Sequence, residues 1–64
     1  MCTINYYSIQ GRPRGGSVKP HSRWGYALED LYKAPRAARI AAVEIDGVTR
    51  RYERTACNGW KRTV

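Results

Sequence analysis

The residues best suited to chemistry in this sequence are basic side chains that alternate with large aromatic ones near the C-terminal end. They are Arg50, Arg51, Tyr52, Arg54, Trp60, Lys61 and Arg62. Cations neutralise phosphate and aromatic rings stack on bases, so this pattern is typical of a surface that binds nucleic acid. It also suits a protein interface, where Arg, Tyr and Trp are the usual anchors. A third interpretation places Tyr52 and Trp60 in the core, with arginine side chains extending around them.

A second group of basic residues belongs to the glycine- and proline-rich stretch 10–21 and the segment just after it. These residues are Arg12, Arg14, Lys19 and Arg23. Gly11-Arg12-Pro13-Arg14 resembles the core of the AT-hook, a short extended motif of chromatin and DNA-bending proteins. The resemblance implies an arginine inserted into the narrow minor groove of A·T-rich DNA. Gln10 stands where that motif carries a basic residue. We therefore expect this stretch to provide positive charge on an extended segment rather than to recognise a base sequence.

The net charge favours a polyanionic partner. Twelve Lys and Arg residues oppose five Asp and Glu residues, which gives a charge of +7 and a pI near 10.0. We predict a small non-enzymatic protein that binds DNA or RNA with low sequence specificity. The alternative is a modulator or inhibitor that docks on an acidic surface of a larger host enzyme or nucleoprotein complex. The size and composition are similar to those of accessory proteins of viruses and mobile elements.

Residues that could perform catalysis or hold a metal are few and scattered. The only histidine, His21, lies in the breaker-rich stretch, and the adjacent Glu29 and Asp30 do not form a facing acid/base pair. Cys2 and Cys57 have no visible activating partner, and a zinc site built from them and His21 would lack a fourth ligand and the usual spacing. We therefore expect no enzyme activity, no cofactor, no metal and no small-molecule substrate.

The elements that must position the basic residues follow from apolar periodicity and turn signals. Residues 3–9 are rich in strand formers, whereas the density of Gly and Pro over 10–21 predicts a flexible loop. Residues 22–34 predict a helix that Ser22 caps and Pro35 ends. Its apolar stripe contains Trp24, Ala27, Leu28 and Leu31.

Residues 36–45 allow two interpretations. Their alanines permit a helix, but the β-branched residues and the following Asp46-Gly47 favour strand–turn–strand, with Ile45 opposite Val48. Asn58-Gly59 predicts a second tight turn and a short last strand. A helix over 36–45 would instead give a winged helix-turn-helix with Arg36 and Arg39 in the major groove of DNA.

The preferred fold is α+β, in one small domain over residues 1–64. We expect the element order β-α-β-β-β, with an antiparallel sheet of three or four strands and one helix packed on one face. No apolar run reaches the roughly 20 residues that span a membrane, and no signal peptide is apparent. The expectation is a cytoplasmic protein (in host cytoplasm if virus-encoded), monomeric or homodimeric, that does not bind membranes and holds its two cysteines as free thiols.

Overall fold

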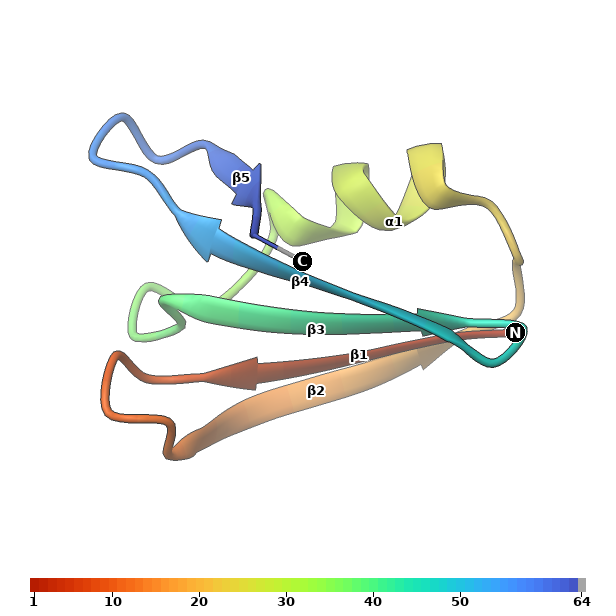
Figure 1. Cartoon of the computed structure of the whole chain (residues 1–64), viewed down its shortest axis with the longest axis horizontal. Coiled ribbons are helices and arrows are strands. Elements are labelled where there is room, and N and C mark those ends of the chain that lie inside the picture. Colours follow the sequence, from red (N-terminus) through yellow and green to blue (C-terminus); the bar gives the residue numbers. More distant parts are fainter. Residues whose placement is uncertain (64) are drawn as a thin grey trace.

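A computed structural model of the chain describes residues 1–63 and shows one helix against a five-stranded antiparallel sheet (Figure 1). The elements are β1 (Cys2–Tyr7), β2 (Pro13–Lys19), α1 (Trp24–Leu31), β3 (Ile40–Ile45), β4 (Val48–Arg54) and β5 (Trp60–Arg62). The strands lie in the order β2-β1-β3-β4-β5, and α1 covers one face of the sheet. The α+β class is confirmed. The sheet has five strands rather than three or four, and the element order is β-β-α-β-β-β.

β2 lies where the glycines and prolines predicted a flexible loop over 10–21. The chain turns over residues 8–12, where Gly11 has a φ of 84°, and Pro13 then opens an outer strand that pairs with β1. A proline at the start of an outer strand has no ladder hydrogen bond to lose. Gly16 permits close strand contact, because a Cβ there would lie 2.7 Å from the carbonyl oxygen of Ile4. The AT-hook-like segment is therefore part of a hairpin and not a free arm.

α1 is shorter than the helix predicted over 22–34. The hydroxyl of Ser22 does not cap it, because Ser22 lies one residue before the N-cap position; that hydroxyl accepts a hydrogen bond from the Met1 ammonium group at 2.6 Å. Arg23 occupies the N-cap position with extended backbone angles and no side-chain cap. At the other end, residues 32–34 leave the helix in turns before Pro35, since the residue before a proline disfavours the helical conformation.

The segment 36–45 contains a turn and β3, so the prediction of strand–turn–strand is confirmed. Ile45 pairs with Val48 across β3 and β4, as expected for a two-residue hairpin. Asp46 and Gly47 have φ values of 52° and 82°, as such a turn requires. The winged helix-turn-helix alternative is wrong, because its second helix would need the residues that form β3.

The hydrophobic core lies between α1 and the sheet. Its buried members are Cys2, Ile4, Tyr6, Ala27, Leu31, Ala38, Ala41, Val43, Ile45 and Tyr52, with Trp24, Ala34 and Trp60 packed at its margin. Buried residues alternate with more exposed ones along β1 and β3, so one face of each strand packs under the helix. Both cysteines are free thiols; Cys2 is buried, and Cys57 is exposed in the β4–β5 turn.

Candidate functional site

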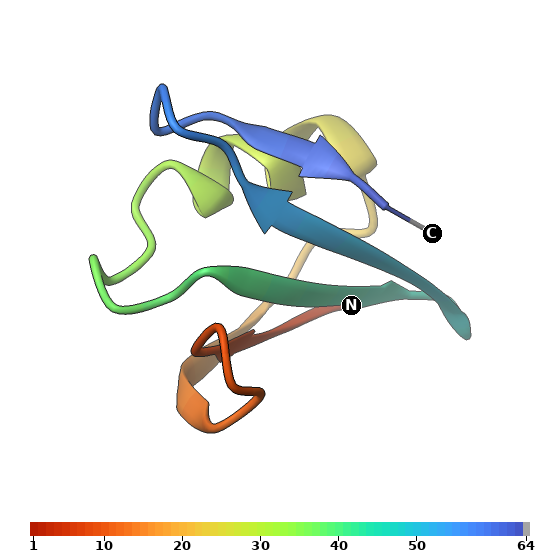
Figure 2. The ribbon, with the colours of Figure 1, turned by 60° about the vertical axis from the view of Figure 1, so that its left-hand side comes forward.

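One end of the sheet collects half of the positive charge. β1 and β4 end there, and β2, β3 and β5 begin there, so the three connections between them lie together at the left of Figure 1 and come forward in Figure 2. The segments 8–14, 32–39 and 54–59 contain six of the twelve Lys and Arg residues and none of the five Asp and Glu residues. We call this the basic end, and its cations are Arg12, Arg14, Lys33, Arg36, Arg39 and Arg54.

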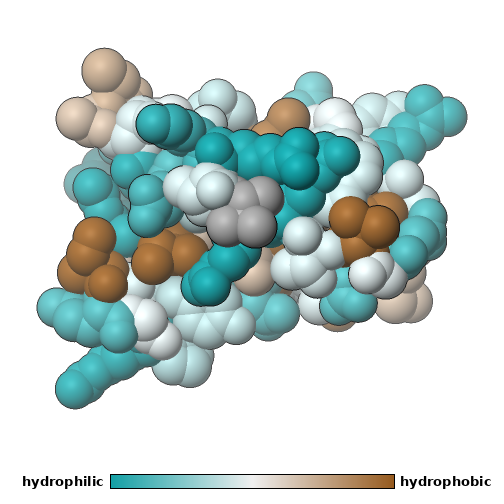
Figure 3. Space-filling model, viewed as in Figure 1, coloured by the Kyte–Doolittle hydropathy of each residue, from teal (hydrophilic) through white to brown (hydrophobic). Residues whose placement is uncertain are grey.

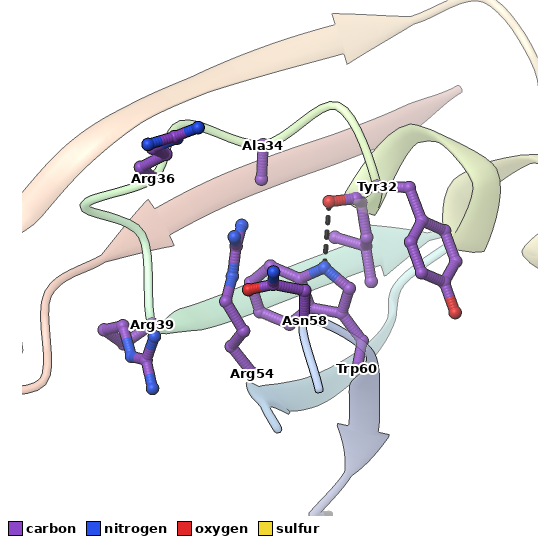
Figure 4. Close-up of a pocket in the computed structure, with 8 residues that line it drawn as sticks. Tyr32, Ala34, Arg36, Arg39, Arg54, Asn58 and Trp60 are labelled. Atoms are coloured by element: carbon purple, nitrogen blue, oxygen red, sulfur yellow. Dashed lines mark hydrogen bonds between the residues drawn. The ribbon is translucent and has the colours of Figure 1, made fainter. Parts of the chain in front are cut away.

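A cavity of about 590 Å³ opens at the basic end, between the C-terminus of α1, the 32–39 connection and the β4–β5 hairpin (Figure 4). It is lined by Leu31, Tyr32, Ala34, Arg36, Arg39, Arg54, Asn58 and Trp60. None of these described lining residues is acidic. No carboxylate within residues 1–63 pairs with the three arginines, and the carboxylate of Asp30 contacts the His21 ring at 3.2 Å. We call this cavity the arginine pocket.

Arg54 is held in place on two sides. Its guanidinium carbon lies 4.7 Å from the centre of the Trp60 ring, and its Nη2 donates a hydrogen bond to the carbonyl oxygen of Pro35 at 3.3 Å. These contacts tie the end of β4 to β5 and to the 32–39 connection. Its Nε is buried and has no hydrogen-bond partner in the described chain. A guanidinium oriented in this way loses little conformational entropy when it binds an anion.

Trp60 forms a wall of the pocket and joins it to the helix. Its Nε1–H donates a hydrogen bond to the carbonyl oxygen of Leu31 at 2.9 Å, the dashed line in Figure 4. Leu31 is the last residue of α1, where carbonyl groups lack partners within the helix. Arg54 and Trp60 are opposite one another in the β4–β5 ladder, so both lie on the same side of the sheet.

The turn between β4 and β5 is closed by its own hydrogen bonds. The Thr55 amide donates to the carbonyl oxygen of Gly59 at 2.8 Å, and the Gly59 amide donates to the Thr55 hydroxyl at 3.0 Å. Asn58 has a φ of 61°, in the left-handed region that asparagine tolerates better than most residues. These bonds fix the position at which the Asn58 side chain lines the pocket.

The alternation of β4 sends its basic residues to both faces of the sheet. Arg50 lies on the helix side, where its guanidinium carbon is 4.1 Å from the centre of the Trp24 ring, and its half-buried side chain supports the core. Arg51 and Lys61 are exposed on the open face, and Arg62 lies opposite Tyr52 on the helix side. The C-terminal cations therefore do not form one continuous patch.

Tyr52 is only 4% exposed and belongs to the core, so its ring is not available to stack on a base as the sequence suggested. Arg12 and Arg14 are exposed beside the basic end, whereas Lys19 and Arg23 lie toward the opposite end of the molecule. Of the predicted binding residues, the structure brings Arg54 and Trp60 together in the arginine pocket.

Six of the eight pocket residues were outside the predicted binding surface: Leu31, Tyr32, Ala34, Arg36, Arg39 and Asn58. Arg36 and Arg39 were assigned a role only in the winged helix-turn-helix alternative, where they would enter the major groove of DNA. The order of the strands could have indicated these residues. In an antiparallel sheet, the chain that enters β3 and the chain that leaves β4 lie at the same end.

A second cavity, of about 350 Å³, lies between β2 and α1 and has a mixed charge. Lys19 and Lys33 line it together with Asp30, whose carboxylate contacts His21. On the face of the molecule seen in Figure 3, hydrophobic residues form small separate patches among hydrophilic and neutral ones. Of these two cavities, only the arginine pocket has charged lining residues that are all positive.

The part of the chain that the structure describes contains no group of three or more His, Cys, Asp or Glu side chains placed to hold a metal ion. No helix within residues 1–63 has the length and apolar character needed to cross a membrane. Comparison with protein-family models, with curated proteins and with solved structures gives no match.

Proposed function

We propose that this chain is a small non-enzymatic protein that binds nucleic acid through its basic end, with backbone phosphate held in the arginine pocket. The observation that carries the proposal is the grouping of Arg36, Arg39 and Arg54 around one cavity whose described lining residues include no carboxylate. A cavity lined by one sign of charge concentrates the field and attracts the opposite charge. Guanidinium groups also match phosphate oxygens with paired hydrogen bonds.

Cations beyond the pocket support a polymeric ligand rather than a small anion. Arg12 and Arg14 extend the positive charge along the β1–β2 hairpin. Arg51 and Lys61 add cations on the open face of the sheet, where Glu53 lies opposite Lys61. Successive phosphates of one strand can contact such separated groups. Tyr32 is 68% exposed beside the pocket, so its ring is available to stack on a base.

The expected sequence specificity is low. Direct readout usually places a helix or a two-stranded ribbon with Arg, Lys, Asn or Gln in the major groove. α1 has the sequence WGYALEDL and carries none of these residues. Binding should therefore depend on phosphate charge and base stacking and vary little with base order.

The test is the salt dependence of binding to labelled oligonucleotides, measured by fluorescence polarisation. The logarithm of the affinity should fall linearly with the logarithm of the salt concentration, by about 0.7 for each phosphate neutralised on a single strand. The double variant Arg36→Gln/Arg39→Gln should weaken binding and reduce the slope by about 1.4 on the same basis. Arg23→Gln removes one exposed cation at the opposite end and should change both quantities less.

An affinity that does not change with salt, or the absence of binding to DNA and RNA alike, would overturn the proposal. A stoichiometric protein partner recovered from nuclease-treated lysate, together with no oligonucleotide binding, would support the modulator alternative.

A further inference from the structure

We propose that the arginine pocket recognises the terminal phosphate of a nucleic-acid strand, the monoester at its end, in preference to the diester phosphates within the strand. This inference rests on the proposed function and specifies the group that the same pocket binds. It follows from the charge, the size and the rigidity of the pocket.

The charge of the pocket exceeds what one internal phosphate can balance. Arg36, Arg39 and Arg54 bring three permanent positive charges to one cavity, and none of the described lining residues opposes them. A diester phosphate carries a single negative charge. A terminal monoester carries about −1.5 to −2 near pH 7 and presents three strong acceptor oxygens. The monoester therefore gains more from three guanidinium groups than the diester does.

The size of the pocket suits the end of a strand. Leu31 and Ala34 contribute apolar lining, Trp60 and Asn58 bound the side formed by the β4–β5 hairpin, and Arg54 lies beside Trp60 (Figure 4). A volume of about 590 Å³ is within the range of sites that hold one small ligand or chain end. Internal phosphates would instead contact the exposed Arg51 and Lys61 on the open face.

The wall of the pocket formed by Arg54 and the β4–β5 hairpin is fixed before any ligand arrives, whereas the Arg36 and Arg39 side chains are exposed. Trp60 is bonded to the end of α1, Arg54 is stacked on Trp60 and bonded to Pro35, and the turn that carries Asn58 is closed by hydrogen bonds to Thr55. A pre-organised Arg54 favours a ligand with one compact, strongly charged group, because this guanidinium needs little ordering when it binds.

The experiment compares one single-stranded oligonucleotide in three forms: 5′-phosphorylated, 3′-phosphorylated, and with hydroxyl groups at both ends. All three carry the same internal fluorescent label, and binding is measured at one salt concentration. We expect at least one phosphorylated form to bind about tenfold more tightly than the hydroxyl form, which corresponds to about 1.4 kcal/mol. The form with the higher affinity identifies which end enters the pocket.

Variants locate the preference. Arg36→Gln and Arg39→Gln change exposed side chains of the pocket and should each reduce the ratio of phosphorylated to hydroxyl affinity. Arg51→Gln removes the same charge from the open face and should weaken all three forms without changing the ratio. Circular dichroism checks that each variant is folded.

Three different outcomes would overturn the inference. Equal, salt-dependent binding of the three forms would refute terminal-phosphate recognition while supporting the nucleic-acid function. Failure of all three forms to bind would refute the proposed function and this inference with it. A phosphate preference that persists in both pocket variants would also contradict the assignment of the preference to this pocket.

Discussion

Replacing Arg54 with methionine tests whether this side chain links β4 to its surroundings. Arg54→Met removes the hydrogen bond to the Pro35 carbonyl and the cation–π contact with Trp60, but it keeps an apolar side chain against the ring. The hydrogen bond is long and exposed, so we assign it about 0.5–1 kcal/mol. The cation–π contact adds about 0.5–1 kcal/mol. The substitution also removes the repulsion between Arg54 and the two other pocket arginines, which offsets about a few tenths of a kcal/mol of this loss.

The expected net loss is about 1 kcal/mol in the free energy of unfolding, or roughly 4–8 °C in Tm for a domain of this size. Urea and thermal unfolding followed by far-UV circular dichroism measure it. The matched control is Arg51→Met, which removes the same charge from the opposite face of the same strand. Among the described residues this side chain has no hydrogen bond to lose, so the free energy of unfolding should stay within about 0.5 kcal/mol of the unsubstituted protein. Equal stability of the two variants would refute the structural role of Arg54.

Three further changes test the core and the sheet. Leu31→Ala empties a fully buried position and should lower the free energy of unfolding by about 3–5 kcal/mol, measured by urea titration. Gly16→Ala places a Cβ 2.7 Å from a backbone carbonyl oxygen and should lower stability by about 1–3 kcal/mol. A Cβ at Gly25 in α1 would have no described neighbour within 4 Å, so Gly25→Ala should raise the stability by about 0.5–1 kcal/mol. Equal Tm values for the two glycine variants would contradict the packing of β2 against β1. Burial raises the pKa of the Cys2 thiol and of the Tyr6 hydroxyl from their ordinary values of 9.0 and 10.0. The unfolded chain therefore ionises first, and stability that is complete below pH 9 should decline as the pH rises further, whereas a flat profile of Tm from pH 8 to 11 would contradict their burial.

The parts of the fold that were predictable depend on local chemistry. A two-residue hairpin needs positive φ at both turn positions, which Asp46 and Gly47 tolerate, so the register of β3 and β4 followed from these two residues. Apolar spacing likewise identified α1. β2 was not predictable in this way, because its Gly and Pro content is typical of a loop and its formation depends on pairing with β1. The Ser22 cap was wrong because the helix begins one residue later, with Arg23 at the N-cap, and the Ser22 hydroxyl contacts the distant Met1 ammonium group.

The residue types of the candidate site were predictable from the sequence, but their positions in the fold were not. The density of arginines and aromatics indicated an anionic partner, and Arg54 and Trp60 do lie together in the pocket. Strand alternation, however, buries Tyr52 and separates Arg50 from Arg51. Arg36 and Arg39 lie at the same pocket as Arg54 because the 32–39 connection and the β4–β5 hairpin meet at one end of the sheet, and neither segment alone shows this.

The most direct test of the account is nuclear magnetic resonance of the ¹⁵N-labelled protein during titration with a short single-stranded oligonucleotide. The Trp60 indole N–H reports on the pocket wall, because it is bonded to Leu31 beside the three arginines. We predict that this signal and the amides of residues 34–39 and 54–60 shift most, with smaller changes at the opposite end near Arg23. Shifts confined to that opposite end or to the open face of the sheet, with the Trp60 indole signal unmoved at saturation, would contradict the account.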